Sequence, residues 1–172
     1  MTRRALFPGR FQPFHKGHEA VIRELLGDFD EVVVVVGSAQ EAFTCRNPFT
    51  AGERIEMIAR ALGRERLWII PVPDLRMPPA WTAYVLSLAP RVDVVAAGNP
   101  EVLLPFAWLG LRTMRVELRE PDKYNGTKIR ELMAGGGEWR PLVPAEVARF
   151  LDEIDGVRRV REVCSRGAGP GD

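Results

Sequence analysis

The run EVVVVVG at residues 31–37 constrains the fold of this chain more than any other segment. Its five consecutive valines are β-branched and favour a strand. A strand with an unbroken apolar run is typical of a parallel sheet, whose two faces are both covered by helices. The rest of the chain supplies such helices, because strand-like and helix-like segments alternate over residues 6–118.

This alternation predicts an α/β fold, a Rossmann-like, doubly wound sheet of five parallel strands followed by C-terminal helices. Ligands of such sheets bind outside the carboxyl ends of the strands. The expected strands are residues 6–7, 31–37, 67–71, 92–97 and 111–118. The expected helices begin near His18, after the capping box at residues 50–53, at residue 80, after Asn99 and at Thr127, and two more cover residues 144–154 and 157–163.

The length of 172 residues fits one domain, expected over residues 1–164 with its helical part starting near 127. The glycine-rich residues 165–172 are expected to be disordered. A net charge of +1 gives no reason to expect a nucleic acid or an anionic membrane as partner. With no visible signal peptide or membrane span, we expect a cytoplasmic protein in which Cys45 and Cys164 are free thiols.

The segment GRFQPFHKGH at residues 9–18 combines the end of a strand, a turn and the start of a helix. It holds His15 and His18, the two histidines of the chain. Unpaired N–H groups at a helix start attract anions, Gly17 lets a phosphate approach the backbone, and imidazoles and Arg10 donate hydrogen bonds. The segment therefore predicts an anion site. The alternatives are two surface histidines or part of a zinc site, although zinc lacks a third histidine and a cysteine cluster here.

A second basic cluster, KYNGTKIR at residues 123–130, surrounds another helix start. Thr127 can cap this helix or donate its hydroxyl to a phosphate, and Arg130 lies one turn further on. A third candidate is Arg46, beyond the segment GSAQ at residues 37–40. The alternatives are a plain helix cap with solvated lysines and an exposed loop arginine.

The motifs together resemble a known family. GRFQPFHKGH resembles the HxGH signature of the nucleotidylyltransferase superfamily, and YNGTKIREL at residues 124–132 resembles its second signature. With GSAQ and NPFTAGERIEMI, the chain resembles the archaeal type of nicotinamide-nucleotide adenylyltransferase over residues 4–163. The resemblance implies transfer of AMP from ATP to nicotinamide mononucleotide (NMN), which gives NAD and pyrophosphate with magnesium, in an assembly that is commonly a hexamer.

The resemblance also implies roles for single residues. The histidines and the arginines of the motifs would contact phosphates, Trp81 would stack on the nicotinamide ring, Asp74 would lie in the loop that recognises the carboxamide, and Asn99 would belong to the nucleotide pocket. The candidate catalytic residues are Arg10, His15, His18 and Arg130. The candidate nucleotide-binding residues are Gly9, Phe11, Gly17, Ser38, Arg46, Asp74, Trp81, Asn99, Tyr124, Gly126 and Thr127.

The implied chemistry fits these residue types. A phosphate oxygen of the mononucleotide is already ionised, so the reaction needs positioning and charge stabilisation rather than a general base. Magnesium is expected to bridge phosphate oxygens, with no protein ligand assigned to it. Trp81 could instead be a core residue. The alternative functions are another adenylyl- or cytidylyltransferase, acting on phosphopantetheine, a flavin nucleotide or glycerol phosphate, a fragment of a class I aminoacyl-tRNA synthetase, and a non-catalytic nucleotide sensor.

Overall fold

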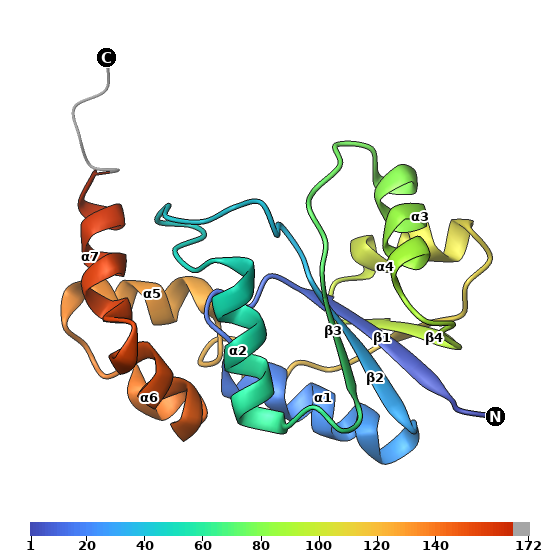
Figure 1. Cartoon of the computed structure of the whole chain (residues 1–172), viewed down its shortest axis with the longest axis horizontal. Helices are drawn as coiled ribbons and strands as arrows, with labels where there is room; N and C mark the ends of the chain where they lie inside the picture. Colours follow the sequence, from blue (N-terminus) through green and yellow to red (C-terminus); the bar gives the residue numbers. More distant parts are fainter. Residues whose placement is uncertain (167–172) are drawn as a thin grey trace.

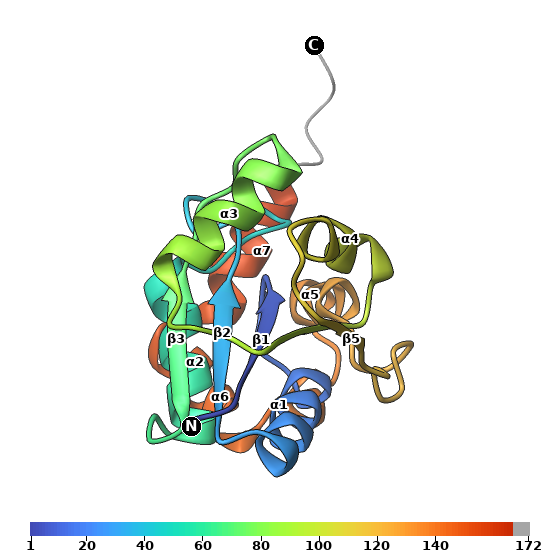
Figure 2. The same ribbon diagram turned by 90° about the vertical axis from the view of Figure 1, so that its right-hand side faces the viewer.

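A computed structural model describes residues 1–166 and contains a five-stranded parallel sheet. Its strands lie in the order β3-β2-β1-β4-β5, so the chain winds outward from β1 in both directions (Figure 2). All four strand pairs are parallel, which confirms the predicted doubly wound α/β sheet. The strands are β1 (Arg4–Gly9), β2 (Glu31–Val36), β3 (Leu67–Pro71), β4 (Val94–Ala97) and β5 (Thr113–Arg115).

Alternate side chains of the strands enter two separate apolar cores. Phe7 and Val34 point toward α1 (Lys16–Asp28) and α2 (Ala51–Leu62), whereas Leu6 and Val33 point toward α3 (Pro78–Leu88) and α4 (Pro100–Trp108). The valines of β2 are fully buried, as a strand covered on both faces requires. Within residues 1–166, no helix is both long and apolar enough to cross a bilayer.

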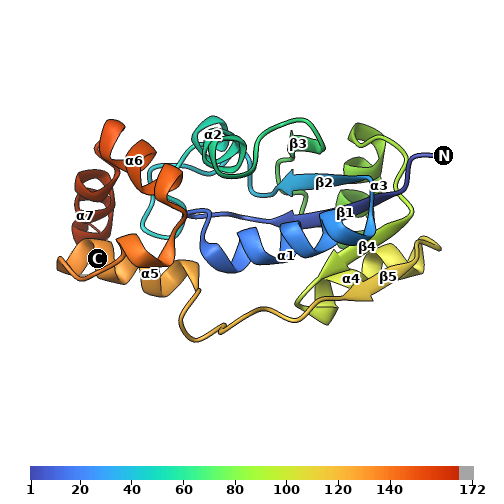
Figure 3. The same ribbon diagram turned by 90° about the horizontal axis from the view of Figure 1, so that it is seen from below.

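The last four helical segments enlarge the core on the α1 and α2 side. Figures 1 and 3 show α5, α6 and α7 beyond the carboxyl ends of β1 and β2. These segments are α5 (Gly126–Gly135), the short 3-10 helix η1 (Arg140–Leu142), α6 (Ala145–Glu153) and α7 (Gly156–Arg166). Gly136, in the left-handed region with φ 75°, ends α5 as the glycine triplet predicted.

Two helix starts differ from the sequence prediction. The first helix begins at Lys16 rather than near His18, because His15 is its N-cap. The helix predicted to start at Thr127 begins at Gly126, because the side chain of Asn125 accepts a hydrogen bond from the backbone N–H of Lys128. The prediction that Thr127 caps the helix is therefore wrong.

Two other element boundaries also differ from the sequence prediction. The last strand covers Thr113–Arg115 rather than residues 111–118, since its partner β4 offers four residues for pairing. The final helix runs on to Arg166, so residues 165 and 166 are helical and not part of a disordered tail. The remaining residues of the expected tail, 167–172, lie outside the described residues.

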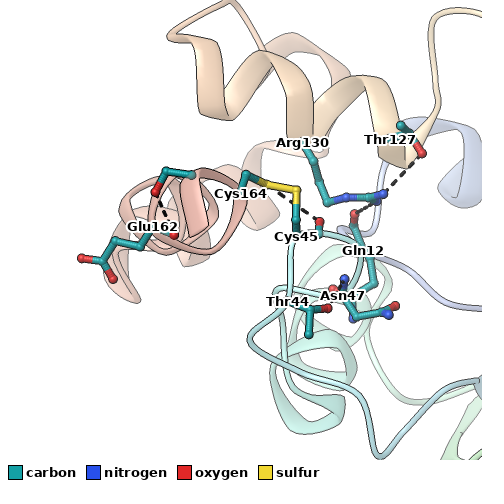
Figure 4. Close-up of a disulfide and its surroundings, with 9 residues drawn as sticks. Gln12, Thr44, Cys45, Asn47, Thr127, Arg130, Glu162 and Cys164 are labelled. Carbon is teal, nitrogen blue, oxygen red and sulfur yellow. Dashed lines mark hydrogen bonds between the residues drawn. A yellow bond between two sulfur atoms is a disulfide. The ribbon is translucent and has the colours of Figure 1, made fainter. Parts of the chain in front are cut away.

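Cys45 and Cys164 form a disulfide, so the prediction of two free thiols is wrong. Their Cα atoms are 4.5 Å apart although 119 positions separate them in the sequence. Packing of α7 against α5 and α6 carries Cys164 to the loop that holds Cys45 (Figure 4). Distance along the chain is a poor guide to such a pairing, because the fold decides which cysteines come within bonding distance.

A buried arginine on α2 joins the ends of the two central strands. The guanidinium of Arg54 donates hydrogen bonds to the carbonyl oxygens of Arg10 (2.8 Å), Gly37 (2.7 Å) and Ser38 (3.1 Å). The side chain is fully buried, and burial lowers its pKa to about 10, with the charge of Arg10 as a smaller cause. Arg54 therefore remains charged at neutral pH and fixes the loops that follow β1 and β2.

Replacing Arg54 with methionine should lower the free energy of unfolding by about 3 kcal/mol or more, because buried carbonyl oxygens lose charged donors. Urea denaturation at pH 7 measures the change. Arg60→Met is the matched control on the same helix, since Arg60 pairs with Glu56 and Glu153 on the surface. Its cost should stay below about 1 kcal/mol. Equal losses in the two variants would contradict the role given to Arg54.

Candidate functional site

Two cavities lie at the carboxyl ends of the strands, and Arg10 lines both of them. The Trp81 cavity has a volume of about 390 Å³, and the arginine cavity one of about 600 Å³. The Trp81 cavity is lined by Pro8, Gly9, Arg10, Gly37, Ser38, Asp74, Leu75, Pro78, Trp81, Thr82, Glu101, Val102 and Pro105. The arginine cavity is lined by Arg10, Cys45, Arg46, Thr127, Arg130, Glu131, Ala134 and Cys164.

The arginine cavity gathers three cationic side chains and one carboxylate, that of Glu131. Burial lowers the pKa of Arg10, and the nearby charge of Arg46 lowers it further. Burial also lowers the pKa of Arg130 to about 10, with the charges of Arg10 and Arg46 as smaller causes. Like charges held this close favour the binding of an anion between them. The structure thus brings together the three arginines that the sequence placed at separate motifs.

Arg130 is held by the segment that contains the histidine motif. Its Nη1 donates to the carbonyl oxygen of Gln12 at 2.8 Å, and its Nη2 donates to the hydroxyl of Thr127 at 3.3 Å (Figure 4). A Cβ on Gly126 would lie 3.1 Å from the Nη1 of Arg130 and 3.3 Å from the Gln12 carbonyl oxygen. Glycine at this position therefore lets the start of α5 approach the first motif.

The two histidines bind each other's backbone. The Nδ1 of His15 accepts from the N–H groups of Gly17 (3.1 Å) and His18 (3.3 Å), and the Nδ1 of His18 accepts from the N–H of His15 (3.2 Å). Those helix-start N–H groups were expected to face an anion, but the histidines already satisfy them. With each Nδ1 acting as acceptor, the neutral rings carry their proton on Nε2 and can donate from there.

Both imidazoles are neutral at pH 7. Burial lowers the pKa of His15 to about 4. Burial, and secondly the charge of His15, holds the pKa of His18 well below its ordinary value. The rings stack with their centroids 3.5 Å apart. Neither is among the residues that line the two cavities, and the side chain of His18 is the more exposed of the two.

Two other residues of the histidine motif have packing roles. Phe11 was a candidate nucleotide contact, but its side chain is buried against Phe14 and His18 and lines neither cavity. A Cβ on Gly17 would lie 2.9 Å from the ring of His15 and 3.0 Å from the Cβ of Tyr124. Glycine is thus required there by side-chain packing. The approach of a phosphate to this backbone stays a prediction.

The Trp81 cavity combines an aromatic wall with carboxylates. The Nε1 of Trp81 is buried and has no hydrogen-bond partner among the described residues. Asp74 exchanges two hydrogen bonds with Gln40, of 2.9 and 3.0 Å, which join the loops after β2 and β3. Asn99 lies outside the cavity as the N-cap of α4, where its side chain accepts from the N–H of Glu101.

The sequence did not indicate several residues that hold the backbone of the site in place or add a carboxylate to it. The side chain of Gln12 exchanges two hydrogen bonds with the backbone of Phe49, of 2.9 and 3.0 Å. Arg54 fixes the backbone of Arg10 and Ser38, and Glu101 adds a carboxylate to the Trp81 cavity. A Gln within a motif and an Arg within an amphipathic helix carry no signal of such long-range contacts.

Comparisons with known proteins identify the family. A family model described as Cytidylyltransferase-like matches residues 6–132. The nicotinamide-nucleotide adenylyltransferase of Archaeoglobus fulgidus is 40% identical over 171 aligned positions, and the match covers 95% of this chain and 98% of that protein. The enzyme of the same name from Ignicoccus hospitalis is 47% identical over 169 aligned positions, and the match covers 95% of this chain and 99% of that protein. The chain belongs to the nicotinamide-nucleotide adenylyltransferase family. This confirms the resemblance found in the motifs.

A solved structure supports the fold of this nicotinamide-nucleotide adenylyltransferase family member. It is a bifunctional NMN adenylyltransferase/ADP-ribose pyrophosphatase from Francisella tularensis, crystallised with AMP and a manganese ion. The TM-score is 0.79 at 19% identity, and the match covers 96% of this chain and 52% of that one. The chain thus corresponds to about half of the bifunctional protein.

The low pKa values of the histidines should make the folded protein less stable as the pH falls from about 6.5 to 4. The unfolded chain takes up protons at its histidines near pH 6.5, while folded His15 does so only near pH 4. Stability from this source is complete above pH 6.5 and is lost on acidification, by about 3 kcal/mol for His15. Urea denaturation at several pH values measures it.

His15→Asn is the control for this pH dependence, because asparagine can still cap the helix but does not titrate. Carboxylate titrations contribute equally to both proteins. The difference in unfolding free energy between wild type and variant should therefore shrink as the pH falls. A difference that is constant with pH would contradict the lowered pKa of His15.

Proposed function

We propose that this chain transfers AMP from ATP to NMN, giving NAD and pyrophosphate. The observation that carries the proposal is the double position of Arg10, which lines both the arginine cavity and the Trp81 cavity. Two substrates bound in these cavities would meet at one guanidinium, where their phosphates could react. The names and high coverage of the relatives support the same reaction.

The two cavities suit the two substrates. The arginine cavity offers Arg46 and Arg130 to the triphosphate of ATP, with Arg10 at its border. The Trp81 cavity offers an aromatic face to a cationic pyridinium ring. Asp74 would then lie beside the ring, and the backbone of Gly9 and Ser38 near the NMN phosphate.

The reaction needs no general base from the protein. An ionised phosphate oxygen of NMN attacks the α-phosphorus of ATP, the new O–P bond forms, and the bond to the β-phosphate breaks so that pyrophosphate leaves with the electron pair. The arginines hold both polyanions in line and offset the charge that develops on the leaving group. His15 and His18 line neither cavity, so their neutral Nε2–H groups would donate only to phosphate oxygens that extend to the start of α1, without adding repulsion to the arginines.

Magnesium fits this site only through the nucleotide. Within residues 1–166, no three His, Cys, Asp or Glu side chains gather closely enough to hold a metal ion. An ion bound to the phosphates of ATP, the usual situation for magnesium, would supply further positive charge at the transferred group. Arg10, Arg46 and Arg130 would bind the phosphate oxygens left free.

A hexameric assembly and a cytoplasmic location stay predictions.

The experiment that tests the function offers ATP and magnesium with NMN, nicotinic acid mononucleotide, phosphopantetheine or flavin mononucleotide in parallel. NAD and pyrophosphate should form with NMN. Activity with phosphopantetheine or flavin mononucleotide alone would assign the site to another transferase. ATP binding with no product from any acceptor would favour a nucleotide sensor.

His18→Asn should lower kcat about a hundredfold, because asparagine can keep the acceptor near Nδ1 but lacks the donor at the position of Nε2. His18→Gln is the matched variant, since its longer amide can place a donor near that position. Steady-state kinetics on both variants measures the effect. If asparagine retained nearly full turnover, His18 would have no part in phosphate transfer.

Trp81→Ala should raise the KM for NMN about five- to tenfold and leave the KM for ATP nearly unchanged, because the cation–π contact to the ring is lost. Trp81→Phe keeps an aromatic face and should show a smaller rise. Initial-rate kinetics with each substrate varied in turn separates the two constants. A rise confined to ATP would contradict the assignment of the two cavities.

A further inference from the structure

The loop at residues 37–50 carries Arg46 to the arginine cavity and is anchored at both ends. At its start, Arg54 binds the carbonyl oxygens of Gly37 and Ser38. At its other end, the side chain of Gln12 exchanges two hydrogen bonds with the backbone of Phe49. The position of Arg46 therefore depends on what holds the stretch between these anchors.

The disulfide helps to hold that stretch, together with the hydrogen-bonded turn between Thr44 and Asn47. Cys45 directly precedes Arg46, and its partner Cys164 lies on α7. Both cysteines line the arginine cavity together with Arg46. Figure 4 shows the bond joining the loop to α7 beside Arg130. The covalent link thus forms part of the wall of the cavity that we assign to polyphosphate.

The helix on the other side of the bond is itself firmly placed. Val160 of α7 is fully buried in the core. The guanidinium of Arg159 pairs with Glu53 at 2.5 Å and lies 5.2 Å from the ring centre of Phe43. These contacts fix α7 and touch the loop without involving the disulfide. Breaking the disulfide should therefore loosen the loop near Cys45 without releasing it completely.

Arg46 has no side-chain anchor of its own. Its side chain is exposed, and it forms no hydrogen bond or ion pair with the described residues. Arg130, in contrast, is buried and bonded to Gln12. The guanidinium of Arg46 is thus positioned through its backbone alone. That backbone is held by the covalent bond at Cys45 and by the turn in which Thr44 and the buried Asn47 exchange hydrogen bonds.

We propose that the Cys45–Cys164 disulfide positions Arg46 for polyphosphate binding, so that reduction of this bond weakens the affinity for ATP. The proposal rests on the proposed function for the identity of the nucleotide, while the anion chemistry of the cavity stands on its own. The disulfide acts as a positioning element, because neither sulfur takes part in the transfer of AMP. ATP binding thereby becomes sensitive to the thiol–disulfide state of the surroundings.

The redox step is an ordinary exchange with a dithiol reductant. A thiolate of the reductant attacks one Sγ, forms a mixed disulfide and releases the other cysteine as a thiolate. The second thiol of the reductant then closes its own ring and releases the first cysteine. Two electrons pass to the protein, which gains two thiols, and the reductant becomes a cyclic disulfide. Cys45 is exposed, so a small dithiol can reach the bond.

Kinetics of the oxidised and the dithiothreitol-reduced protein tests the proposal, with circular dichroism to confirm that both are folded. Reduction should raise the KM for ATP about tenfold, the loss expected for a displaced charged contact. The KM for NMN should change less than about twofold, because the Trp81 cavity lies away from the bond. Cys45→Ser should show the raised KM for ATP without reductant and should not respond to dithiothreitol.

Arg46→Met shows whether the disulfide acts through Arg46. This variant should have a raised KM for ATP in both redox states, and reduction should add no more than about twofold to it. If reduction raised the KM for ATP as much in Arg46→Met as in the wild type, or not at all in the wild type, the proposal would be overturned.

A binding equilibrium separates this proposal from the proposed function. If reduction weakens the binding of tripolyphosphate about tenfold, reciprocal linkage requires that bound tripolyphosphate favour the disulfide by the same factor. Saturating inorganic tripolyphosphate should therefore shift the thiol–disulfide equilibrium with dithiothreitol about tenfold toward the disulfide. Alkylation of free thiols followed by mass spectrometry measures that shift without any turnover. A shift of the redox equilibrium in a protein that makes no NAD would support this inference and contradict the proposed function. NAD formation without such a shift would support the proposed function and contradict this inference.

Discussion

The whole site depends on one buried charge. Carbonyl oxygens that follow the last paired residues of β1 and β2 have no neighbouring strand to supply a donor, and burying them unpaired would be costly. Arg54 on α2 donates hydrogen bonds to three such oxygens, those of Arg10, Gly37 and Ser38. Arg10 and Ser38 are also cavity-lining residues. The same guanidinium that stabilises the sheet edge therefore sets the backbone from which both cavities are built.

Burial acts on two kinds of donor with different results. It lowers the pKa of Arg10 and Arg130, yet both stay charged at neutral pH, whereas it leaves His15 and His18 neutral. The site thus places charge at the arginine cavity and uncharged N–H donors at the start of α1. A polyanion is attracted mainly by the former, while the latter can adapt to its oxygen atoms without raising the electrostatic repulsion already present.

Local patterns in the sequence were enough for the sheet and for the approximate position of the site. The valine run of β2 and the alternation of segments predicted the fold, and the two motifs predicted Arg10 and Arg130 at one edge. The use of Nδ1 of His15 as a helix cap, the choice of Asn125 over Thr127, and the disulfide were not predicted. Each of these depends on which of several chemically able groups the tertiary packing brings within reach, and residue type alone does not decide that.

The disulfide also has a topological consequence. It closes the chain from Cys45 to Cys164 into a covalent ring, and that ring contains β3, β4 and β5 but neither β1 nor β2. In the sheet, β2 and β1 lie between β3 and β4. The centre of the sheet is thus supplied by the segment outside the ring, and the ring has no continuous sheet of its own. A break at any single peptide bond between the two cysteines would still leave one covalent molecule, in which the disulfide joins the part that contains β1 and β2 to the part that contains Cys164.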